Sequence, residues 1–521
     1  MIFNVPSLYA LLFSLSWLCT IPSTGISQER YWNKKYDLDG GNDWGGTIKV
    51  HGDQMIIAVN GFCEENNRNC AGLISVDTSG AVNWTTILYD SLTFNYLEAI
   101  LLIADTVYAN MNYRDIDSLQ FTVVRIDTDT GGVMDRHDYF KETTLSGNYV
   151  ARGITGYQDR FFVAFGVITD GSVPSRHFIR GYDLSWNTLL EVSIPNTYEN
   201  PAWYDIQATP DGGVVAAYTA WQSSTGDRLG TIEKYDSSGA MEWQTNLPYL
   251  GDFEDWMRID LHPDGGYVGF WWYDTFGLQI NPQPNIVFKL DQEGDIEWQH
   301  VEDFYEIFEL YDLFSARNGD LVACGTARYW PFGPPKGPKY EGAFLIRYNA
   351  EGERLWDRKI LVDSSVYWRA LYGGAELANG DLVFTGEICD TTFGIPDDPT
   401  PCNIWVIKVD SMGCFEQDCG EFQHITSRID ILEKDHRDIF AVYPNPASDE
   451  ITIGARLGAY VPHGRYSMHL YDMYGNLSFS QEFDPLMIAY LDVSHYSAGM
   501  YYMTIIRNGR LVQIQKVNLI R

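Results

Sequence analysis

The sequence predicts an all-β protein that consists of a seven-bladed β-propeller followed by a C-terminal immunoglobulin-like β-sandwich. Three observations lead to this fold class: a strand pair that recurs seven times, a second hairpin that accompanies it, and a tail of alternating strands. With 521 residues, 45% of them hydrophobic, the chain has enough apolar material for several domains. The 70 acidic residues outnumber the 36 basic ones, and the net charge of −34 argues against binding of nucleic acid or anionic lipid.

The chain begins with a segment that resembles a signal for export. Residues 7–18 form an apolar run that is shorter than the roughly 20 residues needed to span a bilayer. The small residues Ser23 and Gly25 follow it at positions that suit a signal peptidase. We therefore predict a signal peptide at residues 1–27 and an exported mature protein without a transmembrane segment.

The cysteines fit an oxidising compartment. Three close pairs each bracket a polar segment, which is typical of small disulfide-bonded loops. Metal binding is not expected, because neither C-x-x-C spacing nor nearby histidines accompany them. Cys324 stands alone in an apolar run and is interpreted as a buried small side chain. The predicted disulfides are Cys63–Cys70, Cys389–Cys402 and Cys414–Cys419.

The repeat consists of an alternating strand that ends in Asp or Asn, a short turn that usually contains Gly, and a second strand, as in IEKYDSSGAMEW (232–243). Asp bonds to the local backbone and Gly accepts a positive φ, so the pattern indicates a hairpin. Successive turn residues are 50 to 61 positions apart. They are Asp77, Asp127, Asp183, Asp236, Asp291, Asn349 and Asp410.

A second hairpin, such as IDLHPDGGYVGFW (259–271), precedes the later copies, so that each unit contains four strands. Units of this kind and length are typical of propeller blades, and seven of them predict a propeller over residues 28–419. The seventh unit lacks its last strand, whereas the mature chain starts with a solitary strand that contains Trp32. We therefore expect residues 31–36 to complete the last blade; a linear solenoid is the alternative.

The units are similar to those of short-repeat propellers in secreted bacterial proteins, with a pattern close to I-K-x-D-x-x-G-x-x-x-W. The resemblance covers residues 31–419 and implies an architecture without implying an activity.

The second and third strands of several units are joined by long, aromatic-rich connections, such as residues 270–285 and 328–340. Such loops on a rigid scaffold often bind ligands. Their aromatic rings could stack on sugars or contact a protein; the alternative is that they pack between blades. The candidate ligand-binding residues are Trp271, Trp272, Tyr329, Trp330 and Phe332.

No catalytic motif is recognisable: H-E-x-x-H, G-x-S-x-G and the phosphate-binding Walker loop are absent. We predict no catalytic residue, no metal and no cofactor from local patterns. Carboxylates that converge from distant blades on a central channel could still form a lyase or glycosidase site, because such pairs leave no local motif.

A polar segment at residues 420–439 is interpreted as a linker, and the remaining residues 440–521 contain equal numbers of acidic and basic side chains. Their alternating strands predict a small β-sandwich.

This tail closely resembles the type A C-terminal sorting domain of the type IX secretion system. The resemblance lies in a Tyr-Pro-Asn-Pro opening, a Tyr-Gly-Asn turn and a Ser-x-Gly-x-Tyr segment. It implies a Bacteroidota source, recognition by the secretion machinery at the outer membrane, removal by a sortase-like protease between Gly420 and Tyr443, and surface anchoring or release. An ordinary carbohydrate-binding sandwich is the alternative. The motif residues are Tyr443, Pro444, Asn445, Pro446, Tyr474, Gly475, Asn476, Gly499 and Tyr501.

Together these features predict a secreted or cell-surface propeller that is exported by type IX secretion and binds a glycan or a protein without catalysis. A secreted lyase or glycosidase that acts on polysaccharide is the alternative, and a structural role in the surface layer is a third possibility.

Overall fold

The computed structural model describes residues 31–520 except for short segments, so the predicted signal peptide lies outside the described residues. The segments left out are 38–41, 64–67, 89–93, 115–118, 139–147, 169–175, 195–197, 223–226, 248–254, 274–284, 303–306, 330–339, 363–365, 391–401, 417–418, 420–421, 426–427, 430–439, 456–464, 473–476, 485–486 and 508–509.

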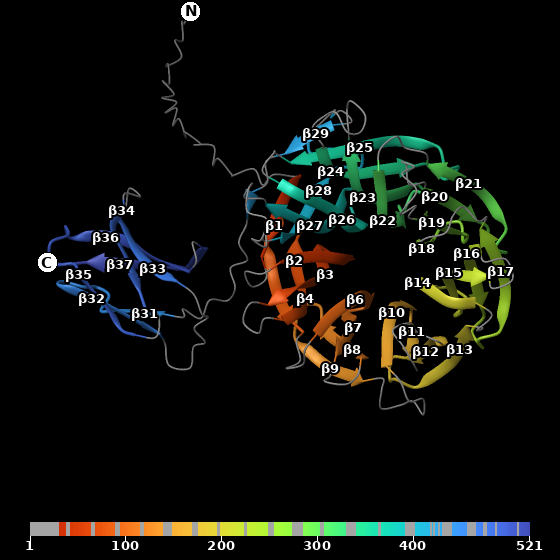
Figure 1. Ribbon diagram of the computed structural model, residues 1–521, viewed down its shortest axis with the longest axis horizontal. Coiled ribbons are helices and arrows are strands. Elements are labelled where there is room, and N and C mark those ends of the chain that lie inside the picture. The colour runs from red at the N-terminus through yellow and green to blue at the C-terminus, as the bar shows by residue number, and fades with distance from the viewer. Residues whose placement is uncertain are drawn as a thin grey trace, which may run out of the picture.

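Seven sheets of the described chain surround a common axis as the blades of a propeller (Figure 1). In the first six blades, four antiparallel strands follow one another along the chain, and the first strand lies nearest the axis. Blade 1 contains β2 (Asp43–His51), β3 (Gln54–Cys63), β4 (Arg68–Asp77) and β5 (Val82–Ile87). Blade 2 contains β6 (Phe94–Ile103), β7 (Thr106–Arg114), β8 (Leu119–Asp127) and β9 (Val133–Asp138). Blade 3 contains β10 (Asn148–Tyr157), β11 (Arg160–Ile168), β12 (Arg176–Asp183) and β13 (Thr188–Ile194).

The remaining blades follow the same plan, and the innermost strands of all successive blades, including the last and the first, touch one another. Blade 4 contains β14 (Tyr198–Ala208), β15 (Val214–Gln222), β16 (Asp227–Tyr235) and β17 (Met241–Leu247). Blade 5 contains β18 (Asp255–Leu261), β19 (Tyr267–Tyr273), β20 (Asn285–Leu290) and β21 (Ile296–Glu302). Blade 6 contains β22 (Ile307–Ser315), β23 (Leu321–Tyr329), β24 (Tyr340–Tyr348) and β25 (Arg354–Val362). Blade 7 contains β26 (Val366–Glu376), β27 (Leu382–Asp390), β28 (Cys402–Val409) and β1 (Trp32–Tyr36).

Each interface between neighbouring blades has its own hydrophobic core, so the middle strands are buried on both faces. In β15, Val214 and Ala216 face the core shared with blade 3, whereas Val215 and Ala217 face the core shared with blade 5. Because both faces of a middle strand are covered by neighbouring blades, successive residues are apolar and the strand is a continuous apolar run.

The first described strand closes the ring. β1 is antiparallel to β28, with residues 32–36 opposite residues 404–408, which confirms the pairing predicted from the sequence. The Trp32 indole N–H also donates to the carbonyl of Thr78 in blade 1, at 3.1 Å. Chain ends that meet in one blade leave no open edge between the first and the last blade.

In the blades that contain it, the tryptophan of the repeat contacts the next blade. The Trp243 indole N–H donates to the carbonyl of Gln292 in the turn of blade 5, at 3.1 Å. Its ring covers Gly294, where an added Cβ would lie only 2.5 Å from Cδ2 and where φ is +86°. The sequence pattern therefore encodes a contact between blades. Trp84 and Trp298 donate in the same way to the carbonyls of Thr128 and Ala350.

A basic residue two positions before the turn residue ties the two hairpins of a blade together. The ammonium of Lys234 lies 2.5 Å from a carboxylate oxygen of Asp211 and also contacts Glu242. Lys289 approaches Asp264 in the equivalent place, at 2.6 Å. These lysine side chains are only 7–8% exposed, so their charges are paired, as burial requires.

Part of the predicted linker belongs to the propeller, which corrects the prediction for residues 420–439. β29 (Phe422–Ile425) runs parallel to β25 at the outer edge of blade 6. β30 (Arg428–Ile429) runs parallel to β1 at the outer edge of blade 7.

The C-terminal unit has two sheets around one core. In the smaller sheet, β32 (Glu450–Ala455) lies between β31 (Phe440–Tyr443) and β35 (Ala489–Asp492). The larger sheet has the order β34 (Leu477–Phe483), β33 (Tyr466–Asp472), β36 (Gly499–Arg507) and β37 (Arg510–Leu519). Side chains from both sheets, including those of Ile451, Ile453, Met468 and Met503, share the core. Its immunoglobulin-like connectivity stays a prediction. In the described residues, no helix is long and apolar enough to cross a membrane.

Candidate functional site: the propeller axis and the C-terminal unit

The two ends of the blades differ. At one end, tight turns join the strands; in the turn after β4, for example, the N–H of Gly80 donates to the carbonyl of Asp77 at 2.8 Å. At the other end lie the longer connections, such as those from Tyr273 to Asn285 and from Asp390 to Cys402. We call this second end the long-connection face.

Of the five candidate ligand-binding residues, the structure describes the side chain of Trp271, and this side chain is not available to a ligand. Trp271 is 1% exposed and lies in the core between blades 4 and 5, against Gly230. The prediction that it contacts a ligand is therefore wrong, because the residue packs blade against blade. The side chains of Trp272 and Tyr329, and the whole of Trp330 and Phe332, lie outside the described residues.

Two of the three predicted disulfides are confirmed, Cys389–Cys402 and Cys414–Cys419. Cys70 is also disulfide-bonded, but the side chain of its predicted partner Cys63 lies outside the described residues.

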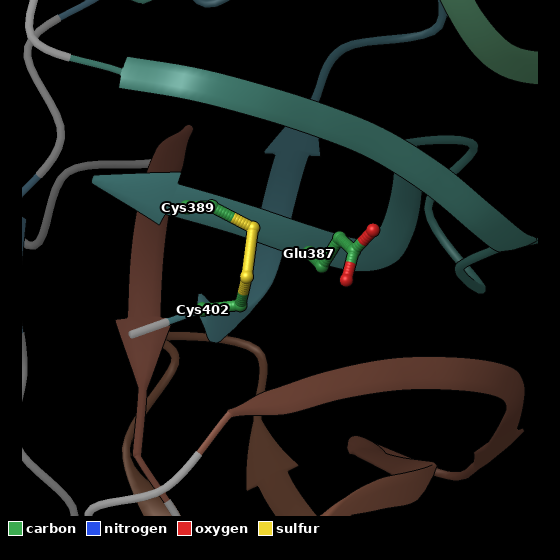
Figure 2. Close-up of side chains that lie close together, drawn as sticks. All are labelled: Glu387, Cys389 and Cys402. Carbon is green, nitrogen blue, oxygen red and sulfur yellow. A yellow bond between two sulfur atoms is a disulfide. The ribbon is translucent and has the colours of Figure 1, made fainter. Parts of the chain in front are cut away.

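Figure 2 shows the Cys389–Cys402 disulfide between β27 and β28, with the carboxylate of Glu387 beside it. In the described residues, this trio is the one group with suitably close ligand atoms for a metal ion. Its two sulfur atoms are bonded to each other, so no thiolate is available for a metal. The disulfide instead joins the two strands at the start of a long connection.

The innermost strands carry a second group of polar and aromatic side chains, and this group was missed by the sequence analysis. Most of these strands contain a β-bulge, in which one extra residue is displaced from the ladder. Bulges redirect side chains and are frequent near active sites. Among the displaced residues are Glu98 in β6, Arg152 in β10, Tyr311 in β22 and Tyr372 in β26.

Further partly exposed residues of the innermost strands surround these four. The rings of Trp44 and Tyr96 lie 6.4 Å apart at the beginning of β2 and β6, towards the long-connection face. The rings of Tyr311 and Tyr372 meet edge to face at 4.8 Å. We define the axial cluster as Trp44, Tyr96, Glu98, Arg152, Asp205, Arg258, Asp260, Tyr311, Asp312 and Tyr372.

Arg258 links the cluster electrostatically across the axis. It projects from blade 5, and its charge acts on Glu98 of blade 2, on Asp205 of blade 4 and on Asp312 of blade 6. Its guanidinium is 3.8 Å from a carboxylate oxygen of Asp205. The two side chains are 28% and 21% exposed, so solvent reaches them in the middle of the ring.

Backbone groups of the adjacent blade hold the axial aspartates. Asp205 accepts the N–H of Ile259 at 3.0 Å, Asp260 accepts the N–H of Ser315, and Asp312 accepts that of Gly374, both at 2.8 Å. Each aspartate therefore joins its own innermost strand to the next one. Burial nevertheless raises the pKa of all three carboxyls.

Glu98 accepts a hydrogen bond from a side chain, that of Asn112, whereas each of the three aspartates accepts a backbone N–H of the adjacent blade. Asn112 donates to Glu98 at 3.3 Å, and the same amide holds both backbone groups of Ala151 in the next blade. Burial raises the pKa of Glu98 to about 7, against the opposing charges of Arg152 and Arg258. Its carboxyl can therefore lose or gain a proton near neutral pH.

The opening motif of the C-terminal unit is fixed by its asparagine. The Asn445 side chain donates to the carbonyl of Lys516 at 2.7 Å and accepts the N–H of Asn518 at 2.9 Å, both in β37. Tyr443 is 49% exposed.

The closing motif contributes to the core. Tyr501, two residues after Gly499 at the start of β36, is buried, and its hydroxyl donates to the carbonyl of Ser497 at 3.1 Å. Pro444 and Pro446 are exposed, and Tyr474, Gly475 and Asn476 lie outside the described residues.

Comparison with known families decides the nature of this unit: residues 441–519 match the family described as "Secretion system C-terminal sorting domain". The chain carries a type IX secretion sorting domain. The sorting domain directs export to the cell surface or the extracellular space and implies interaction with the secretion machinery.

Other comparisons concern the fold alone. No curated protein matches the chain as a sequence relative. The β-propeller domain of the Trilobed protease from Pyrococcus furiosus is 7% identical, with a TM-score of 0.43, over 72% of this chain and 97% of that one. Phage phi92 endosialidase is 8% identical, with a TM-score of 0.41, over 94% of this chain and 87% of that one. A protein of unknown function from Bacteroides caccae is 12% identical, with a TM-score of 0.32, over 56% of this chain and 87% of that one.

Proposed function

We propose that this protein is a non-catalytic glycan-binding propeller, displayed on or released from the cell surface after type IX secretion. The observation that carries the proposal is the set of bulges that directs Glu98, Arg152, Tyr311 and Tyr372 away from the strand ladders at the axis. We further propose that a signal peptide precedes the propeller, that a surface protease removes the sorting domain, and that the source is a Bacteroidota bacterium.

The chemistry of the axial cluster suits a sugar. Aromatic rings cover the apolar C–H faces of sugars, while carboxylates and guanidinium groups bond to hydroxyls. Tyr311 donates its hydroxyl to Glu309, and Tyr372 donates to Glu387 at 2.5 Å, so both rings are held in place. Held rings lose little conformational entropy when a ligand binds.

Two of the axial aspartates support a non-catalytic role. Both oxygens of Asp205 accept a backbone N–H, from Ile206 and Ile259. Those of Asp260 accept the Gln207 amide and the N–H of Ser315, so both carboxylates are already used to join blades. A general acid or base needs an oxygen that can reach the substrate.

An array of bacterial, plant and host polysaccharides, followed by calorimetry with the best-bound one, tests the proposal. We expect the double variant Tyr311→Ala/Tyr372→Ala to lose about tenfold or more in affinity. Tyr157→Ala is the matched control, since Tyr157 is 37% exposed at the opposite end of the blades, and it should bind like wild type. Absence of binding to every polysaccharide, or unchanged affinity of the double variant, would overturn the proposal.

Glu98 favours a second candidate function, that of a lyase or glycosidase. Its pKa of about 7 suits proton transfer near neutral pH. Incubation of the bound polysaccharide with wild type and with Glu98→Gln distinguishes the two functions. Cleavage by wild type alone would establish the enzyme, whereas an intact polymer in both would support binding without turnover.

A further inference from the structure

The segment after the last disulfide lies on the outer edges of two blades. In β29, residues 422–425 lie opposite residues 359–362 of β25, and in β30, Arg428 and Ile429 lie opposite Lys34 and Lys35 of β1. The Cys414–Cys419 disulfide precedes β29 and keeps its start close to the turn after β28.

The closing strand β1 is therefore enclosed on both sides. It contains five residues and pairs with β28 on its inner side and with β30 on its outer side. The outer pairing covers part of the strand edge that would otherwise be available to other chains. Short strands separate easily from a sheet, so a second neighbour has a large effect on β1.

We propose that β29 and β30 form a latch that locks the closing strand and stays with the propeller when the sorting domain is removed. The locking part of this proposal depends only on the strand pairing. The retention part rests on the proposed removal of the sorting domain by a protease. Proteases cut extended backbone that is free of a strand ladder, so paired residues of the latch are poor substrates.

Hydrogen exchange of the full chain, read by mass spectrometry, tests the lock. We expect those amides of residues 422–425 and 428–429 that point towards β25 and β1 to be protected in the wild type. Alternate residues of a strand direct their N–H groups to one neighbour, so Arg428→Pro/Ile429→Pro removes the pairing to β1 whichever residue donates. The amides of β1 should then exchange about tenfold faster or more, while those of β4 stay unchanged.

Glu433→Pro, beyond the latch, is the matched control and should leave the exchange of β1 unaltered. Unprotected latch amides in the wild type, or unchanged exchange of β1 in the double variant, would overturn the lock. The intact mass of the surface form tests retention: a C-terminus at or beyond Ile429 is expected, and one before Ile429 would overturn it. A surface form that still ends at Arg521 would contradict removal of the sorting domain, and the exchange result would still decide on the lock.

Discussion

The same residue type has opposite electrostatic behaviour at two places in this protein. In the turns, Asp236 accepts the hydroxyl of Ser238 and the N–H groups of Ala240 and Ser238, and these bonds lower its pKa because they favour the charged form. At the axis, burial raises the pKa of Asp205 and Asp260 although backbone N–H groups point at them. The depth of the carboxyl below the surface therefore outweighs its hydrogen bonds.

The raised pKa of Glu98 predicts how stability depends on pH. The unfolded carboxyl has a pKa near 4.5 and the folded one near 7, so the folded state holds the extra proton between these values. Its contribution to stability is full below pH 4.5 and is lost as the pH rises through 7. Between pH 5 and 7 the free energy of unfolding should fall by roughly 2 kcal/mol more in wild type than in Glu98→Gln.

Thermal or urea unfolding at pH 5, 6, 7 and 8 measures this difference. The turn aspartates, whose pKa values are lowered, lose their contribution only at more acidic pH, so they do not disturb this range. If the free energy of unfolding depended on pH equally in the two proteins, the raised pKa of Glu98 would be contradicted.

At the scale of the element, the contact between a tryptophan and the next turn defines the blade repeat. Gly294→Ala should destabilise the protein by about 1–3 kcal/mol more than Gly380→Ala does. Both glycines have φ near +85°, so both substitutions add backbone strain. At Gly294 the new Cβ also meets the ring of Trp243, whereas nothing lies within 4 Å at Gly380.

Urea unfolding of the two variants measures this difference. The pairing of two glycines with equal φ separates the packing from the strain. If the two variants were equally stable, the tryptophan contact would contribute nothing to the joint between blades 4 and 5.

The elements that a local repeat encodes could be predicted from the sequence. The groups of side chains that come together at the axis from distant blades could not. Hairpins could be predicted from turn aspartates such as Asp236, and closure of the ring from the solitary Trp32. Each of these residues, like Trp243, makes its contacts within one repeat unit or with the next unit. Glu98 and Arg258 lie on blades that are far apart in the sequence, and the bulge that displaces Glu98 has no residue signature. Trp271 takes the alternative that the sequence left open, packing between blades, because its strand is buried on both faces.

At the scale of the whole molecule, the chain joins a closed propeller to a domain that directs export. The propeller has a core at every interface between blades, and the sorting domain has a separate core of its own. Independent cores allow one part to be removed while the other stays folded. Loss of the sorting domain should therefore change the destination of the protein and not the propeller fold.

The most direct test is the location of the protein in a bacterium with a functional type IX secretion system, with and without residues 440–521. The full chain should be found on the cell surface or in the medium. The shortened chain should be retained inside the cell envelope with its propeller folded, as judged by unchanged exchange protection of β2 to β28. Equal amounts of both proteins outside the cell would contradict the account.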